Sequence, residues 1–366
     1  MRIGEYVSLA CSLGCTVGGN RPVRSVGLRP GDRIAVVSPS RTLPNKFPEV
    51  ANKGMENIRK YFGLEPVVYP HAFDGLSFAY DHPQLRADDI NSAFSDQEIK
   101  AVISTIGGDE SVRILKFLDR NRIMQNPKTF TGFSDCTTVT TFLSVNGMTN
   151  VYGGAVMAGF AQMDHFPERF RDYWKALLFE DSEGLTMEPF TEYSEGYPDW
   201  NTSLDPGAVN RKSPSRPWKW ISRESMEGKI FAANIEVLDW LRGTEFFPPI
   251  SFFKGKLLFL ETSEEVPSPV AVERMIRSIN IMGVIDQIAG LAFARFRGYT
   301  EGMNTEIEGI LDRILEKEFS NSALPIVTGL DFGHTDPYFP IPNLIRAKVN
   351  GREIKLLESF APAAKS

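Results

Sequence analysis

The sequence is poor in cysteine and histidine, the side chains on which disulfide frameworks and zinc sites depend. It has three cysteines and four histidines in 366 residues. An odd, small number of cysteines argues against a disulfide framework and for a reducing compartment, so we expect a cytoplasmic protein. The histidines lie neither near one another nor near a cysteine pair, so we expect no metal site and no cofactor.

Long apolar runs and blocks of one charge are also missing. No apolar run approaches the roughly 20 residues that a membrane-spanning helix needs, so no membrane partner is expected. Acids and bases are interspersed and leave a formal net charge of -6. This balance argues for a soluble protein and against nucleic-acid binding, which usually needs a basic face. The length of 366 residues, 42% of them hydrophobic, predicts two domains.

Strand-like and helix-like stretches alternate in the first half of the chain. Residues 33–37, 66–69, 101–106 and 126–134 read as strands, and helix-like segments, such as 50–61 and 112–118, follow them. This alternation predicts an α/β fold with a parallel sheet covered on both faces. In such sheets, functional sites form at the carboxyl ends of the strands.

A serine marks the end of one of these strands. The stretch "KTFTGFSDCTT" passes from an apolar strand to a polar helix at Ser134, with the small residues Gly132 and Cys136 two places to either side. A sharp strand-to-helix turn needs small residues there, and the adjacent helix N-terminus suits an oxyanion. The pattern predicts a nucleophilic serine; the alternative is that Ser134 only caps the helix.

A nucleophilic serine needs a base and a group that orients the base. His334 follows an apolar strand and lies among turn residues in "GLDFGHTDP", where its side chain can reach a cleft. Glu261 stands where the apolar strand of "GKLLFLETSEE" gives way to a polar loop. These residues are the candidate base and acid; the alternatives are a hydrogen-bonded loop histidine and a solvated strand end.

The glycine-rich turn in "STIGGDES" lies between another strand and another helix. It lacks the lysine of a Walker loop and the spacing of a dinucleotide-binding motif, so it is a weak phosphate site. It fits better as the donor of a backbone N–H beside the serine of the neighbouring strand.

Five segments together resemble the LD-carboxypeptidase family of serine peptidases, and within it the microcin C immunity peptidases. They are "TIGGDESVRIL", "NPKTFTGFSDCTTV", "NIEVLDWLRGT", "LFLETSEE" and "GLDFGHTDPYFPIP". They occur in the family's order and at about its separations, from about residue 28 to residue 355. The resemblance implies Ser134 as nucleophile, Glu261 as acid and His334 as base. It also implies an oxyanion hole formed by the amides of Asp135 and Gly108.

The resemblance further implies three substrate contacts. Asn234 is one, although the chain has "AAN" at 232–234 where family members often have Gly-Gly-Asn. Trp200 and Trp218 lie in an irregular segment rich in Pro, Gly and Ser, and immunity-type members use a tryptophan-bearing loop to stack on a nucleobase. The alternative is that these tryptophans pin the loop to the body of the protein.

The resemblance implies a fold of two parts with the active site in the cleft between them. It also implies a homodimer. The first part is an N-terminal parallel-sheet α/β sandwich, and the second is a smaller C-terminal β-rich α/β domain. We expect a loose extension at 1–27, the domain with the nucleophile at 28–186, a linker with the tryptophan-bearing loop at 187–226, and the domain with the acid and the histidine at 227–366.

The function predicted is that of a serine carboxypeptidase. It hydrolyses an amide bond near the C-terminus of a peptidyl or aminoacyl nucleotide through an acyl-enzyme, so its partner is a small peptide or peptidyl-nucleotide substrate. One alternative is an LD-carboxypeptidase that acts on murein tetrapeptide. The other is a non-catalytic nucleotide-binding α/β module, in which Ser134 only caps a helix.

Overall fold

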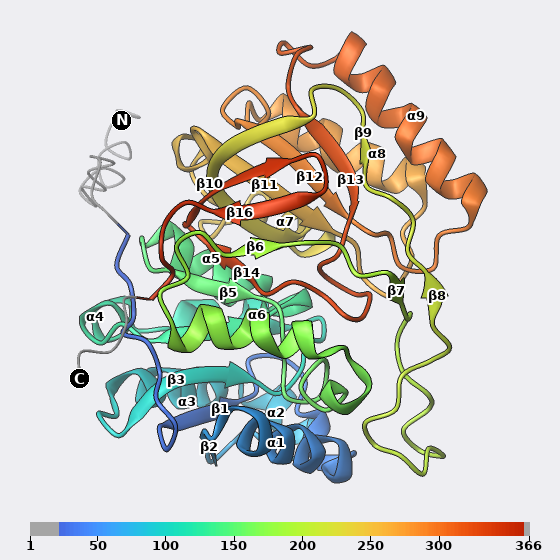
Figure 1. The fold of residues 1–366 in the computed structure, drawn as a ribbon. Coiled ribbons are helices and arrows are strands. Elements are labelled where there is room, and N and C mark those ends of the chain that lie inside the picture. Colours follow the sequence, from blue (N-terminus) through green and yellow to red (C-terminus); the bar gives the residue numbers. More distant parts are fainter. Residues whose placement is uncertain (1–21, 362–366) are drawn as a thin grey trace, which may run out of the picture.

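Two β-sheets with helices packed on them make up the described part of the protein, residues 22–361 of a computed structural model (Figure 1). The sheet built mainly from the N-terminal half lies below the sheet built mainly from the C-terminal half in Figure 1. The predicted α/β fold class with parallel strands is confirmed. Between residues 22 and 361, no helix is long and apolar enough to cross a membrane.

The first sheet has six strands, and all of its neighbouring pairs are parallel except β14 with β5 at one edge. Its side chains alternate between two buried faces: Ile34 and Val36 enter one core, and Ala35 and Val37 enter the other. In order across the sheet, the strands are β14 (Ile341–Asn343), β5 (Asn150–Tyr152), β4 (Thr129–Gly132), β3 (Ile99–Ser104), β1 (Arg33–Val37) and β2 (Glu65–Val68).

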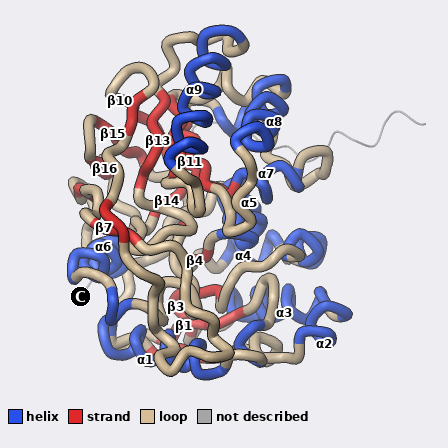
Figure 2. Tube along the Cα trace, turned by 90° about the vertical axis from the view of Figure 1, so that its right-hand side faces the viewer, coloured by secondary structure: helices blue, strands red, loops and turns tan. Residues whose placement is uncertain are grey.

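Helices cover both faces of this sheet, as its two buried faces require. Helices α1 and α6 share one core, and α3, α4 and α5 share the other, so the two groups lie on opposite sides in Figure 2. The helices of this half are α1 (Pro48–Phe62), α2 (Leu76–Asp81), α3 (Pro83–Ser95), α4 (Arg120–Gln125), α5 (Thr137–Val145) and α6 (Glu168–Phe179). Three-ten turns join them at η1 (Leu43–Asn45), η2 (Ser111–Phe117), η3 (Ser134–Cys136) and η4 (Met163–His165).

The helix expected at 112–118 is the three-ten segment η2. Its first residue, Ser111, donates its backbone N–H to the Asp135 carboxylate at 2.8 Å and its hydroxyl to the Asp135 carbonyl at 2.7 Å. These bonds to a distant part of the chain fix the first turn, whereas helix-like periodicity in the sequence reports only on the local preference.

The second sheet has eight strands, with a parallel centre from β10 to β13 and antiparallel strands on both sides. Helices α8 and α9 pack on one face, and the other face joins the core of α1 and α6. In order, the strands are β6 (Thr186–Met187), β16 (Glu353–Leu356), β15 (Arg346–Asn350), β10 (Ser225–Asn234), β11 (Lys256–Glu261), β12 (Gly290–Ala294), β13 (Ile326–Leu330) and β9 (Lys219–Trp220). The helices of this half are α7 (Ile235–Leu241), η5 (Ile250–Phe253), α8 (Pro269–Ile281) and α9 (Glu301–Lys317).

The segment expected to be a linker contains short strands. Strands β7 (Glu192–Tyr193) and β8 (Ser213–Pro214) pair with each other and run beside both sheets in Figure 1. Strand β6, at the end of the expected N-terminal domain, joins the second sheet, and β14, from the C-terminal half, joins the first. The division at 186 and 226 therefore stays a prediction, because strands cross it in both directions.

The expected N-terminal extension falls mostly outside the described residues, which begin at 22. Its last residues are anchored: Val23 bonds to the backbone of 147 and 149, and the Ser25 and Thr129 hydroxyls lie 2.6 Å apart. Residues 23 and 25, which were expected to belong to the loose extension, are thus bonded to the first domain.

A buried asparagine joins the two sheets. Asn343, on β14 of the first sheet, accepts the Ala232 N–H of β10 at 2.7 Å and donates to the Asn150 side-chain oxygen at 2.9 Å. Both sheets contribute to the functional site, so this side chain helps to fix their relative position.

Replacing Asn343 by Ala should lower the free energy of unfolding by about 2–4 kcal/mol, because it leaves a buried N–H and a buried amide oxygen without partners. Urea denaturation of the purified protein measures this loss. The matched control is Asn121→Ala, at an exposed asparagine, which should change stability by less than about 0.5 kcal/mol. Equal losses in the two variants would contradict the role given to Asn343.

Candidate active site

The serine at the end of β4 has the backbone geometry of a strained turn. Ser134 has φ of 59°, in the left-handed region that non-glycine residues rarely adopt. A Cβ placed on Gly132 would lie 2.7 Å from Ser104 Oγ and 3.0 Å from Cys136 Cβ. The residues two before and two after the serine therefore face each other across the turn, which is why both are small.

Three residues far apart in sequence form one hydrogen-bonded string. His334 Nε2 lies 3.0 Å from Ser134 Oγ, and His334 Nδ1 lies 2.5 Å from Glu261 Oε2. Ser134 follows β4 of the first sheet, Glu261 is the last residue of β11, and His334 lies in the loop after β13. The structure therefore brings together the three residues that the sequence analysis selected, at the carboxyl ends of parallel strands.

The second oxygen of Glu261 is held by a tyrosine that the sequence analysis missed. The Tyr152 hydroxyl donates to Glu261 Oε1 at 2.6 Å and accepts the Ser134 N–H at 3.2 Å. Burial, reinforced by the Glu261 charge, raises the pKa of this phenol well above its usual value, so it stays a donor. The only sequence signal is its position at the end of β5, beside the strand that carries the serine.

Asn234 also holds Glu261, and the substrate contact expected for it stays a prediction. Its side-chain N–H donates to Glu261 Oε1 at 3.1 Å, and its side-chain oxygen accepts the Val237 N–H at 3.0 Å as the N-cap of α7. Asn234 is buried, and both of its side-chain polar groups are bonded to the protein. It is therefore placed to orient the acid.

Two backbone amides near the serine turn are the donors expected for an oxyanion. The backbone N–H groups of Asp135 and Gly108 have no hydrogen-bond partner between residues 22 and 361. The glycine turn approaches closely, since a Cβ on Gly107 would lie 2.9 Å from Ser134 Cβ. A donor pair next to the nucleophile is the arrangement that stabilises a tetrahedral intermediate.

The Asp135 side chain binds the loops around the turn, a role that the sequence analysis did not predict. Its carboxylate accepts the Ser40 hydroxyl at 2.5 Å and the backbone N–H groups of Glu110 and Ser111 at 3.0 and 2.8 Å. Burial raises the pKa of Asp135, and these hydrogen bonds oppose the rise. The carboxylate thus ties the chain that follows the Gly107–Gly108 turn to the loop at Ser40.

A cavity of about 350 Å³ opens over Ser134 and His334. Trp200 lines it and packs edge-on against Phe47, with ring centroids 5.3 Å apart, and stacks on Tyr197 at 5.8 Å. Trp218 lies outside the cavity, which differs from the substrate contact expected for it. It is buried, and its indole N–H donates to the Asp331 carboxylate at 3.0 Å, so it pins the loop to the body of the protein.

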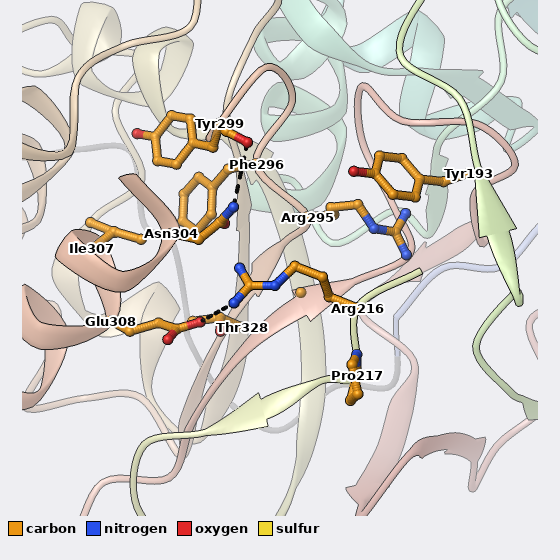
Figure 3. A pocket seen from close by; sticks show the side chains of 11 residues that line it. Tyr193, Arg216, Pro217, Arg295, Phe296, Tyr299, Asn304, Ile307, Glu308 and Thr328 are labelled. Atoms are coloured by element: carbon orange, nitrogen blue, oxygen red, sulfur yellow. Dashed lines mark hydrogen bonds and ion pairs between the residues drawn. The ribbon is translucent and has the colours of Figure 1, made fainter. Parts of the chain in front are cut away.

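A second cavity lies between the β7–β8 segment and α9 (Figure 3). Its volume is about 30 Å³, which is room for roughly one water molecule. Its charged side chains are paired: Arg216 with Glu308, and Arg295 with Asp331. It therefore offers neither the space nor the free charges of a substrate site.

Comparison with protein families fits this geometry. The model of the LD-carboxypeptidase N-terminal domain matches residues 34–153, and that of the LD-carboxypeptidase C-terminal domain matches residues 227–349. The chain belongs to the LD-carboxypeptidase family. It is accordingly a serine carboxypeptidase, a hydrolase.

Relatives of this chain carry two kinds of name. The microcin C7 self-immunity protein of Escherichia coli is 24% identical over 287 residues, covering 76% of this chain and 80% of that protein. A Bacillus subtilis protein named as a murein peptide carboxypeptidase is 25% identical over 327 residues, covering 89% and 91%. Among solved structures, an MccF-like protein from Streptococcus pneumoniae in complex with AMP matches with a TM-score of 0.77 and 27% identity, over 89% of this chain and 98% of that one.

Two carboxylates set the charge state of the histidine. Burial, the largest single effect, lowers the pKa of His334, but Glu261 and Glu264 outweigh it and raise this pKa above its usual value of 6.5. Glu264 Oε2 lies 3.1 Å from His334 Nε2, the nitrogen that also faces Ser134. The Glu264 side chain is 56% exposed, so solvent weakens its effect relative to that of the buried Glu261.

Activity should rise with pH above neutrality, because the imidazole accepts a proton only after it has lost its own, and its pKa is raised. Glu264→Gln removes one of the charges that raise this pKa and should move the rise in kcat/KM to lower pH. The pH profile of kcat/KM measures the shift. Glu265→Gln, at the exposed neighbouring residue, is the matched control and should leave the profile in place. A profile that Glu264→Gln leaves unchanged would contradict this account.

Proposed function

We propose that this carboxypeptidase hydrolyses an amide bond near the C-terminus of a peptidyl or aminoacyl nucleotide through a Ser134–His334–Glu261 triad. The hydrogen-bonded string of these residues, with distances of 3.0 and 2.5 Å, carries the proposal. Its position on the wall of a cavity of about 350 Å³ gives a substrate access to the serine.

The reaction proceeds in two halves. His334 Nε2 takes the Ser134 proton while Oγ attacks the scissile carbonyl, and the amides of Asp135 and Gly108 bind the resulting oxyanion. His334 then gives the proton to the leaving nitrogen, the C–N bond breaks, and an ester on Ser134 remains. Water attacks this ester with His334 again as base, which releases the acid and restores the serine. Glu261 holds the imidazole tautomer throughout and stabilises its positive charge.

The aromatic wall of the cavity supports a nucleotide as part of the substrate. Trp200 and Tyr197 lie nearly parallel, at 14°, and both line the cavity. An aromatic face there can stack on a nucleobase, and the MccF-like protein from Streptococcus pneumoniae was solved with AMP. The side chain of Asn234, which we expect to touch the substrate, also donates to Glu261 and so orients the proposed acid.

A murein peptide is the second candidate substrate. The Bacillus subtilis relative named as a murein peptide carboxypeptidase favours it. The same triad would cleave an L,D amide bond, and the two candidates differ in whether the leaving group carries a base. A non-catalytic nucleotide-binding module fits less well, because a helix-capping serine needs neither His334 nor Glu261 beside it.

The proposal extends to assembly and compartment. The family resemblance leads us to expect a homodimer, and the few cysteines favour the cytoplasm. Light scattering of the purified protein should give twice the chain mass of 40.9 kDa. A monomer would refute the expected homodimer.

Fractionation of producing cells should place the protein with cytoplasmic markers. An exported protein would refute the expected compartment.

Removing any triad member should abolish most turnover without unfolding the protein. We expect Ser134→Ala and His334→Ala each to lower kcat by roughly 10⁴- to 10⁶-fold, and the double variant to lose little more, since the residues act as a unit. Kinetics on an aminoacyl sulfamoyl adenosine and on a murein tetrapeptide measure this. His82→Ala, at an exposed histidine, is the matched control. A Ser134→Ala protein with wild-type kcat would rule the mechanism out.

Trp200→Ala should separate the two candidate substrates. Loss of base stacking, worth about 1–3 kcal/mol, should lower kcat/KM for aminoacyl nucleotides by about 5- to 150-fold and affect murein peptides much less. Trp240→Ala, at a partly exposed tryptophan of α7, is the control and should change neither. Equal losses on both substrates would mean that Trp200 only supports the cavity wall.

A further inference from the structure

One cation of the catalytic cavity has no anionic partner. Arg297 lines the cavity and is partly buried, yet its guanidinium forms no ion pair or hydrogen bond with any residue from 22 to 361. The other arginine of the cavity lining, Arg41, is neutralised: it donates to the two oxygens of Asp109 at 3.2 and 2.7 Å. A guanidinium that is half withdrawn from water and left unpaired is ready to bind an anion.

The fold places Arg297 beside the reacting groups. It follows β12, and β12 lies between β11, which ends at Glu261, and β13, which leads to His334. The carboxyl ends of these parallel strands meet at one edge of the sheet. Gly196, with φ of 71°, backs the guanidinium, because a Cβ there would collide with it. The β7–β8 segment therefore leaves room for the side chain and confines it to the cavity.

The acids around Arg297 leave part of its charge uncompensated. Burial raises the pKa of Asp336 to about 7, against the opposing effects of a Tyr197 hydrogen bond and of Arg297 itself. Asp336 is thus only partly ionised near neutral pH. Glu264, the other acid nearby, has its carboxylate against His334 Nε2. Neither acid forms an ion pair with Arg297.

We propose that Arg297 binds an anionic group in the leaving portion of the substrate, and so selects substrates whose departing amine carries a negative charge close to the scissile bond. This inference rests on the proposed triad, because the triad defines which side of the substrate departs. His334 Nε2 gives its proton to the leaving nitrogen. The Glu264 carboxylate lies 3.1 Å from this same Nε2 atom. Arg297 lines the same cavity as His334 and Glu264, so the proposal places it on the leaving side.

Two leaving groups supply such an anion. A peptide supplies the carboxylate of its last residue, which a guanidinium binds through two parallel hydrogen bonds. An aminoacyl nucleotide linked through a phosphoramidate supplies an anionic oxygen on the phosphorus atom that is bonded directly to the scissile nitrogen. The two sources share one chemistry, and matched neutral substrates separate them.

The test compares charged and neutral versions of each leaving group. The peptide pair has a free C-terminal carboxylate or a carboxamide, and the nucleotide pair has an anionic phosphoramidate or an uncharged linker. Wild-type protein should prefer the charged member of the accepted pair by about 10- to 150-fold in kcat/KM. Arg297→Ala should abolish this preference, mainly by lowering kcat/KM on the charged member, while turnover of the neutral member stays within about threefold.

Two further variants separate binding from structural support. Arg297→Lys keeps the charge but loses the planar fork, so it should restore part of the preference. Arg346→Ala removes an exposed arginine paired with Glu227 on the second sheet and should change nothing. Equal losses on charged and neutral substrates, or no loss on either, would overturn the assignment.

Binding measurements keep the inference testable if the wild-type protein cleaves none of these substrates, an outcome that would refute the proposed function. Calorimetry on Ser134→Ala should then show tighter binding of the charged member of a pair. This advantage should disappear in the Ser134→Ala/Arg297→Ala double variant. Equal affinity for the charged and neutral members, or an advantage that survives in the double variant, would overturn the role of Arg297, as would failure of all four ligands to bind.

Discussion

A carboxylate with no access to solvent holds the two halves of the site together. The side chain of Glu261 is fully buried, and an unpaired charge in that position would cost several kcal/mol. Three donors remove this cost: the His334 ring, the Tyr152 hydroxyl and the Asn234 amide. One donor comes from the first sheet and two from the second. The requirement to satisfy this charge therefore fixes the position of His334 relative to Ser134.

The residues that the structure brings together were selected from constraints that are visible in the sequence. Ser134 stands out because a sharp turn excludes large residues two places to either side. The small residues Gly132 and Cys136 at these positions are visible in the sequence. His334 and Glu261 were selected because parallel strands bring their carboxyl ends together, which is a property of the fold class. The α/β fold itself follows from the alternation of apolar strands and helices.

The residues that were missed or misplaced depend on contacts across the two sheets. A tyrosine at a strand end looks like any core tyrosine, and only the approach of Glu261 makes Tyr152 part of the site. The sequence around Asn234 does not show whether this side chain caps a helix or contacts a substrate. In the structure, it caps the N-terminus of α7. Trp200 and Trp218 occur in one irregular segment, and nothing local shows which of them meets Asp331 in the interior.

The separation of the triad along the chain has a consequence for biosynthesis. The nucleophile and the base are 200 residues apart, and β14, which completes the edge of the first sheet, follows the base. A nascent chain that has folded its N-terminal half therefore has a serine turn but no histidine to activate it. Under the proposed mechanism, hydrolytic competence cannot arise before residue 334 has been synthesised, so a product truncated before that residue would be an inert protein rather than an unregulated peptidase.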